Sequence, residues 1–181
     1  MSTYHHRDLR TALLRAAGKR LEKQGITALS VREAARRVGV SHNAPYRHFA
    51  DREALLAALA AQGFEMLGQA MRGQTGRGMG EAYVRFALQY PQRFRLMFGG
   101  QVALEKYPRL RAAASSAFDQ LQSAFSAYGG DARSAAAAAW SLVHGLCHLI
   151  LDGHFAQRDE EFVKRVLGVV RFAVGGPQRS A

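Results

Sequence analysis

Residues 30–49 read Ser-Val-Arg-Glu-Ala-Ala-Arg-Arg-Val-Gly-Val-Ser-His-Asn-Ala-Pro-Tyr-Arg-His-Phe. Ser30 and Glu33 have the spacing of a capping box, in which both side chains satisfy free backbone donors where a helix begins. The apolar residues that follow share one helical face: Val31, Ala34, Ala35 and Val38. Gly39 is expected to end this helix, because glycine accepts the left-handed geometry found at helix termini.

A second helix is expected to begin at His42, with Ser41 as its cap after the three-residue turn Gly39-Val40-Ser41. Pro45 lies in the first or second turn of this helix, where a missing N–H costs less than in mid-helix. Two short helices joined by a tight glycine turn predict a helix-turn-helix. The leading end of its second helix would lie against base edges in the major groove of DNA.

The stretch from Leu9 to Leu59 resembles the DNA-binding domain of the TetR/AcrR family of bacterial transcriptional regulators. The resemblance rests on Ser30-Val31-Arg32-Glu33-Ala34-Ala35, Gly39-Val40-Ser41, Tyr46-Arg47-His48-Phe49 and Asp51-Arg52-Glu53-Ala54-Leu55-Leu56. Pro45 departs from the family pattern, which usually has a leucine or another inward-packing apolar residue at that position.

Three residues at the start of the second helix are the expected base readers. The Asn43 amide can bind adenine, His42 can reach a purine N7, and the Ala44 methyl can contact thymine. The resemblance adds Arg47 as a further base reader and Arg32 as a contact to guanine or phosphate. For His42, a purely solvated side chain is the alternative.

The resemblance also implies a set of phosphate contacts, which fix the register on DNA without specifying sequence. They would come from Tyr46 and His48, from the Ser30 hydroxyl with the nearby backbone N–H groups, and from the charge of Arg52. Tyr46 could instead be an aromatic at the edge of the core, and Phe49 is expected inside it.

The charge distribution agrees with a nucleic-acid partner. The 181 residues carry a formal net charge of +11, and residues 1–50 hold 10 Lys/Arg against 3 Asp/Glu. Such a basic excess attracts phosphates of any sequence through counterion release, so DNA affinity should fall steeply with salt.

The amino-acid composition indicates a globular protein and bears on its cellular location. With 48% hydrophobic residues the chain can form a real core. A single cysteine, Cys147, and a polar N-terminus without an apolar run predict a cytoplasmic protein. The longest apolar stretch, 135–151, carries two histidines and is shorter than the roughly 20 residues of a membrane span, so a buried helix and no membrane partner are expected.

Apolar periodicity predicts an all-α protein with two domains. Residues 1–52 form the three-helix DNA-binding domain, and residues 53–181 form a helical bundle for ligand binding and dimerisation. Helices are expected over 7–24, 51–72, 83–90, 94–98, 110–128, 132–152 and 159–174. The glycine-rich stretch 73–80 is expected to be flexible.

The helices expected over 132–152 and 159–174 carry more apolar surface than one small domain needs. The helix over 132–152 is apolar on nearly all sides. They predict a homodimer through a four-helix bundle, the region through which the resembled family also dimerises. The expected interface residues are Leu142, Leu146, Ile150, Phe162, Val166 and Val170. The alternative is that both helices only close the core of one chain.

Aromatic and other large apolar side chains of the C-terminal region suit a pocket for a small apolar or amphipathic effector, although they suit an ordinary core equally well. The expected lining residues are Leu67, Phe86, Phe94, Met97, Phe98, Phe118, Phe125, Trp140 and His144. Residues 83–100 and Trp140-Ser141-Leu142-Val143-His144-Gly145 resemble a C-terminal subgroup of the family that is named for its Trp, His and Gly.

Metal and redox chemistry are weaker alternatives. His144 and His148 share a helix face at i, i+4 with Cys147 adjacent, a spacing that can bind zinc. A second ligand motif and a resolving cysteine are both missing from the sequence, so no cofactor or metal is expected. Phosphate loops, nucleophile elbows and metalloprotease motifs are also absent, and we expect no enzyme.

These observations together predict a dimeric DNA-binding repressor that acts on a palindromic operator of double-stranded DNA and is released by its effector. An architectural DNA binder without an effector and a metal or redox sensor using His144, Cys147 and His148 are the alternatives.

Overall fold

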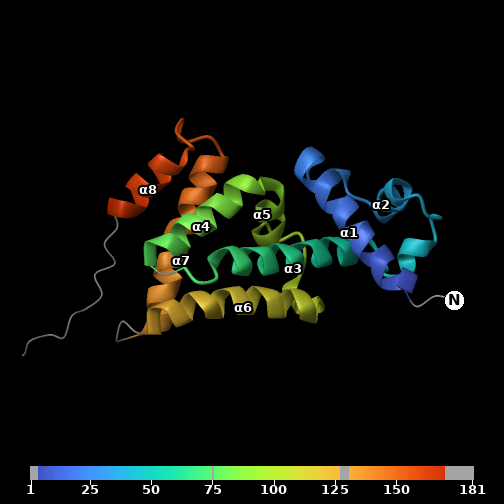
Figure 1. Ribbon diagram of the computed structural model, residues 1–181, viewed down its shortest axis with the longest axis horizontal. Helices are drawn as coiled ribbons and strands as arrows, with labels where there is room; N and C mark the ends of the chain where they lie inside the picture. The colour runs from blue at the N-terminus through green and yellow to red at the C-terminus, as the bar shows by residue number, and fades with distance from the viewer. Residues whose placement is uncertain (1–3, 75, 127–130, 170–181) are drawn as a thin grey trace, which may run out of the picture. The chain divides into compact units, whose positions relative to one another are not determined.

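The computed structural model describes residues 4–74, 76–126 and 131–169, and over these residues it contains helices and no strands (Figure 1). The all-α prediction is confirmed. The α-helices are α1 (Tyr4–Gln24), α2 (Val31–Val38), α3 (Arg52–Met71), α4 (Gly76–Gln89), α5 (Pro91–Phe98), α6 (Pro108–Phe125), α7 (Ala132–Leu151) and α8 (Glu160–Val169). Short 3₁₀ helices are η1 (Ile26–Ala28), η2 (Ala44–Arg47) and η3 (Leu104–Lys106).

The chain forms two compact units that are not consecutive in sequence. The first contains residues up to 65 together with 90–114, and the second contains 66–89 together with the residues from 115 onward. This division differs from the predicted domains 1–52 and 53–181, because α5 and the start of α6 belong with the helix-turn-helix segment. Helices α3 and α6 each contribute residues to both units.

The ends of α2 lie where the sequence predicts them. The Ser30 Oγ accepts the backbone N–H of Glu33 at 3.1 Å, and Gly39 closes the helix with a left-handed φ of 74°. The second half of the predicted capping box is wrong, because the Glu33 carboxylate does not turn back to the backbone. It accepts hydrogen bonds from the guanidinium groups of Arg20, Arg36 and Arg37 instead.

Helices α1 and α3 both contribute buried residues to the core of the first unit. Leu13, Ala17 and Leu21 of α1 are buried as their spacing predicts, and the central leucines of α3 are fully buried as well. Phe49 is only 2% exposed, which confirms its predicted place in the core. The Arg10 guanidinium covers the Phe49 ring, with Cζ 5.3 Å from the ring centroid.

A buried arginine fastens α5 to the other two long helices of this unit. The Arg93 Nη1 donates to the Leu59 carbonyl oxygen at 3.2 Å and to Gln62 Oε1 at 3.1 Å. The Glu22 carboxylate of α1 accepts the backbone N–H groups of Gln92 and Arg93, and thereby caps the first turn of α5. Burial lowers the pKa of Arg93, and the carboxylate of Glu22, 3.8 Å from Arg93 Nε, opposes that shift.

Two glycines make the close approach of α5 possible. A Cβ at Gly18 would lie 2.5 Å from the Arg93 guanidinium, and a Cβ at Gly63 would lie 2.5 Å from the sulfur of Met97. Real Cβ atoms essentially never approach other atoms so closely, so a larger residue at either position would require the side chain of Arg93 or Met97 to move.

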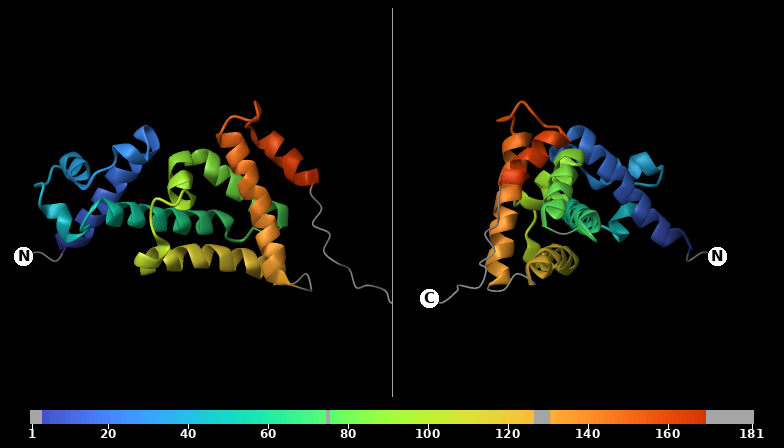
Figure 2. Two further views of the ribbon diagram at one scale, coloured as in Figure 1. Left: turned by 180° about the vertical axis from the view of Figure 1, so that it is seen from behind. Right: turned by 60° about the vertical axis from the view of Figure 1, so that its left-hand side comes forward.

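In the second unit, α4 packs against both α7 and α8 (Figure 2). Asp131 caps α7 as predicted, with its Oδ1 accepting the backbone N–H groups of Arg133 and Ser134. Helix α4 begins at Gly76, so the predicted flexibility does not extend over 76–80, which are helical. A Cβ at Gly80 would lie 3.2 Å from Val143 and 3.3 Å from Leu167, so glycine lets α4 approach α7 and α8 closely.

Other predicted helix boundaries agree only in part. Asp51 caps α3 as predicted by accepting the N–H of Ala54 at 2.7 Å, whereas α5 begins at Pro91, before its predicted start at Phe94. The predicted ends of α6 at Tyr128 and of α8 at Val174, together with Val170, lie outside the described residues.

Within one chain, helix α7 is buried on one side and exposed on the other, so its own chain covers only part of the helix that was predicted to be buried. By length and composition it is apolar enough to cross a membrane, which for one helix is weak evidence, and only 33% of its most apolar window is buried. Ile150 is fully buried, whereas Leu149 is 43% exposed. Ala138 and Ser141 are exposed on the same side as Leu149.

We expect Arg93→Ala to lower the free energy of unfolding by about 2 to 3 kcal/mol, because it removes a buried charge with three polar partners. Urea titration followed by circular dichroism measures the change. Arg15→Ala, at an exposed position of α1, is the control and should change stability by less than about 0.5 kcal/mol. Equal effects of the two substitutions would show that Arg93 does not fasten α5.

Candidate nucleic-acid interface

The second element of the helix-turn-helix is shorter than predicted. The structure has the 3₁₀ helix η2 over Ala44–Arg47 in place of an α-helix that begins at His42. Pro45 explains the difference. In an α-helix the Ser41 carbonyl would accept the N–H of residue 45, which proline lacks, and here it accepts the N–H of Ala44 at 3.2 Å.

The buried and exposed sides of this segment are clearly separated. Pro45 is fully buried, so it takes the inward position that an apolar residue usually fills in the resembled family. His42, Asn43, Tyr46 and Arg47 are exposed. The predicted contacts Ala44 and His48 are half-buried.

Tyr46 is 41% exposed, which argues against a place in the core. Its hydroxyl can therefore reach a phosphate. The structure thus gathers four exposed polar side chains of the predicted set on one short segment that follows α2: His42, Asn43, Tyr46 and Arg47.

Arg52 makes hydrogen bonds within the protein that were not predicted from the sequence. Its Nε donates to the Leu29 carbonyl oxygen at 2.9 Å, and its Nη2 donates to the Ile26 carbonyl oxygen at 2.7 Å. The first turn of α3 is thereby tied to the chain that leads into α2. A phosphate contact by Arg52 stays a prediction, and any such contact would use the remaining donors of the same guanidinium.

Arginines concentrate positive charge on α2. Hydrogen bonds from Arg36, with further contributions from Arg20 and Arg37, lower the pKa of Glu33 to about 2. Glu33 therefore stays ionised at neutral pH, and the cluster of three arginines and one glutamate keeps a net positive charge. Arg32 is exposed on the same helix, and Ser30, whose oxygen accepts the Glu33 N–H, lies at its N-terminus. Phosphates are attracted to such a surface.

The nine residues of the predicted effector pocket do not belong to one unit. Phe94, Met97 and Phe98 lie in the first unit, where the ring centroids of Phe94 and Phe98 are 5.0 Å apart. The second unit contains Leu67, Phe86, Phe118, Phe125, Trp140 and His144.

In the second unit the aromatic residues form part of a packed core. The rings of Phe118 and Trp140 are 5.9 Å apart, and Phe118 also packs against a core of Phe125, Ala136 and Ala139. An effector pocket made by these residues stays a prediction.

A hydrogen-bonded chain joins Tyr83 of α4 to two of the predicted residues of α7. The Trp140 Nε1 donates to the Tyr83 hydroxyl oxygen at 2.9 Å, and the same hydroxyl lies 2.9 Å from His144 Nδ1. Because the indole N–H can only donate, the tyrosine hydrogen can be given to His144. The sequence placed Tyr83 on a helix, but α4 and α7 had to be paired before its partners could be identified.

The environment of His144 and Cys147 weighs against the metal and redox alternative. Burial raises the pKa of Cys147 to about 12, so the thiolate that would bind a metal or react with an oxidant is disfavoured. His144 is engaged by Tyr83, and the ring of His148 lies 4.7 Å from its own. Among the described side chains, no three His, Cys, Asp or Glu residues could hold a metal ion together.

The residues predicted for the dimer interface differ in how deeply they are buried. Leu146 and Ile150 are buried within one chain, because they lie on the inward side of α7, so they are unavailable to a second chain. Leu142, Phe162 and Val166 are half-buried, and Val170 lies outside the described residues.

Comparison with known proteins establishes the family. Residues 13–59 match bacterial regulatory proteins of the tetR family, and residues 76–170 match the tetracyclin repressor-like C-terminal domain. The chain belongs to the TetR family of transcriptional regulators. The finer likeness to the subgroup named for Trp, His and Gly stays a prediction.

Several solved structures share the fold. A protein of unknown function from Rhodococcus sp. RHA1 is 33% identical with a TM-score of 0.78, over 93% of this chain and 96% of its own. The TetR family transcriptional regulator PfmR from Thermus thermophilus is 22% identical with a TM-score of 0.61, over 86% and 94%. NalD of Pseudomonas aeruginosa is 20% identical with a TM-score of 0.58, over 90% and 94%. No curated protein matches the chain.

The partly buried imidazole of His144 predicts a loss of stability in mild acid. Burial, and secondarily the nearby His148, lowers the pKa of His144 below its ordinary 6.5, so the unfolded chain binds a proton at higher pH than the folded chain does. This contribution to stability is complete above pH 6.5 and is lost as the pH falls through the folded-state pKa.

Thermal unfolding at about pH 7.5 and about pH 5.5, on either side of the ordinary histidine pKa, measures this effect in the wild type and in His144→Gln. The variant should lose less stability between the two pH values than the wild type does. His154→Gln, at an exposed histidine, is the matched control and should behave like the wild type. An unchanged pH dependence in His144→Gln would contradict the prediction.

Proposed function

We propose that this TetR-family protein is a cytoplasmic homodimeric repressor that binds a palindromic DNA operator and is released by a small apolar or amphipathic effector. The observation that carries the proposal is the segment His42–Arg47, which presents four exposed polar side chains next to the arginines of α2. Exposed side chains that include an amide and an imidazole can read base edges, and the adjacent guanidinium groups can bind phosphates.

The exposed side of α7 supports the homodimer. Leu142, Gly145 and Leu149 recur at helical spacing with Ala138 on one side of α7, and a Cβ at Gly145 would meet nothing within 4 Å. Small residues let a second helix approach closely, and a two-fold axis would place the same side of a second α7 against the first. We therefore propose these residues in place of Leu146 and Ile150.

Release by an effector requires that the effector bind one arrangement of the dimer better than another. In a two-fold dimer the two recognition segments must match half-sites about 34 to 36 Å apart, one turn of DNA. The assignment as a repressor is supported by the shared fold with NalD, which is described as the secondary repressor of the MexAB-OprM multidrug efflux pump.

Binding to an operator tests the role of the recognition segment. We expect the purified protein to protect an inverted repeat in the DNA that neighbours its own coding region. Asn43→Ala should lose about 1 to 3 kcal/mol of binding free energy on the operator, with the loss confined to operators that keep one particular base pair. Fluorescence anisotropy with single-base operator variants measures it.

Tyr46→Phe is the matched comparison, since it removes a proposed phosphate contact and should weaken binding to all duplexes alike. A uniform loss across all sequences for Asn43→Ala would remove it as a base reader. No preference for any palindrome over random duplex at moderate salt would contradict the proposed function itself.

Leu149→Glu tests the proposed dimer. A charge on the exposed side of α7 would be buried without a partner in the dimer, so we expect monomers at concentrations where the wild type is dimeric. Analytical ultracentrifugation gives the oligomeric state. Arg15→Gln, at an exposed position of α1, lowers the net charge by the same single unit and is the control that should leave the dimer intact. A dimeric Leu149→Glu protein would place the interface elsewhere.

A further inference from the structure

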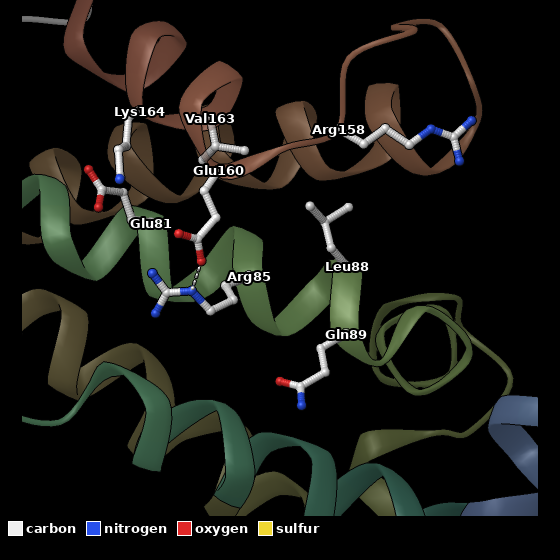
Figure 3. A pocket seen from close by; sticks show the side chains of 8 residues that line it. All are labelled: Glu81, Arg85, Leu88, Gln89, Arg158, Glu160, Val163 and Lys164. Carbon is white, nitrogen blue, oxygen red and sulfur yellow. Dashed lines mark hydrogen bonds and ion pairs between the residues drawn. The ribbon is translucent and has the colours of Figure 1, made fainter.

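A cleft of about 400 Å³ lies between α4 and α8 in the second unit (Figure 3). Its size falls within the range of about 300 to 1,000 Å³ that is typical of small-molecule sites. The lining side chains come from α4 and from α8 with the loop before it: Glu81, Arg85, Leu88, Gln89, Arg158, Glu160, Val163 and Lys164. None of the nine residues of the predicted effector pocket is among them.

Most charges around the cleft neutralise one another. The Arg85 Nε lies 3.1 Å from Glu160 Oε1, the pair marked by the dashed line in Figure 3. Lys164 pairs with Glu161 at 2.9 Å, and Glu81 pairs with Arg77 of its own helix at 3.4 Å. Every carboxylate that lines the cleft is therefore matched by a cation.

Arg158 is the exception. Within the part of the chain that the structure describes, its guanidinium makes no ion pair or hydrogen bond, and the residue is exposed. The lining of the cleft thus carries one positive charge without a partner. A guanidinium presents paired N–H donors that match the two oxygens of a carboxylate.

The cleft also has an apolar wall. Val163 is only 5% exposed, and Leu88 is half-buried. Figure 3 shows Leu88 projecting from α4 toward the chain that carries Arg158 and Val163. A ligand that lies here would cover apolar surface from both sides of the cleft, with the unmatched cation at its edge.

We propose that this cleft binds a small organic carboxylate, with its apolar body on Leu88 and Val163 and its carboxylate group at Arg158. A neutral analogue would gain only the apolar contacts, and a cationic analogue would be repelled by Arg158. The inference goes beyond the proposed function, since it adds a site outside the predicted effector residues.

The full-length protein and the probe 4-phenylbutyrate test the inference. Its phenyl ring would shift the NMR signals of nearby methyl groups, so methyl spectra should show the largest shifts at Leu88 and Val163. Calorimetric titration gives the affinity. We expect 4-phenylbutyrate to bind more tightly than the neutral 4-phenylbutanol, and 4-phenylbutylamine to bind most weakly.

Arg158→Gln should weaken 4-phenylbutyrate binding about threefold to tenfold and leave 4-phenylbutanol binding unchanged. Arg165→Gln is the matched control, because Arg165 is exposed on α8 and does not line the cleft. It should leave both affinities unchanged.

Three results would overturn the inference. These are the lack of saturable binding at millimolar probe, the largest shifts at methyl groups away from the cleft, and an unchanged affinity in Arg158→Gln. Operator protection by the same preparation separates the two proposals. Protein that protects its palindrome but does not bind the probe refutes only the cleft, and the opposite result refutes only the repressor.

Discussion

The buried guanidinium of Arg93 is the interaction on which the first unit depends. An unpaired charge at 6% exposure would be costly, and here the guanidinium has the Glu22 carboxylate of α1 at 3.8 Å and also donates to the Leu59 carbonyl oxygen and Gln62 Oε1 of α3. The Glu22 carboxylate also accepts two backbone N–H groups in the first turn of α5. Helix α5 is consequently part of the body that carries the recognition segment. A displacement of α5 must either move α1 with it or break these bonds.

Pro45 imposes the second constraint, and it acts on the recognition segment directly. By removing one amide hydrogen it changes the bonding from i→i−4 to i→i−3 and shortens the helix to a single 3₁₀ turn. The buried ring also anchors the turn to the core beneath it. Short 3₁₀ turns have poorer hydrogen bonds than α-helices, so the buried Pro45 and the buried Phe49, which follows the turn, together hold the exposed side chains in place.

How much the sequence could predict depended on how local the determinants were. Ser30, Gly39 and Asp131 act within four residues of their own position, and the helix boundaries that they predict are confirmed. The effect of Pro45 on the backbone is also local, but the sequence did not show that the segment would form a 3₁₀ turn in place of an α-helix. The pairing of Glu22 with Arg93 joins residues 71 apart, and no spacing rule reaches that far.

The residues of the predicted DNA-binding site also divide into those with local determinants and those that depend on distant parts of the chain. Exposure of His42, Asn43 and Tyr46 follows from a short segment whose apolar positions are already known. The clamp made by Arg52 could not be predicted, since it depends on where the carbonyl groups of residues 26 and 29 point in the folded unit. The inward and outward sides of α7 were likewise undetermined, because this helix carries alanine or larger apolar residues on nearly all sides.

The orientation of α7 limits what can cover its exposed side. Its inward side is committed to α4, through contacts such as that of Val143 with Gly80, so lipid cannot surround the whole helix. Its outward side combines Leu149 with the small residues Ala138, Ser141 and Gly145. A regular element that approaches closely along the helix axis suits such a surface better than an irregular loop does. The same helix of a second chain meets that requirement under two-fold symmetry, since both surfaces are then identical.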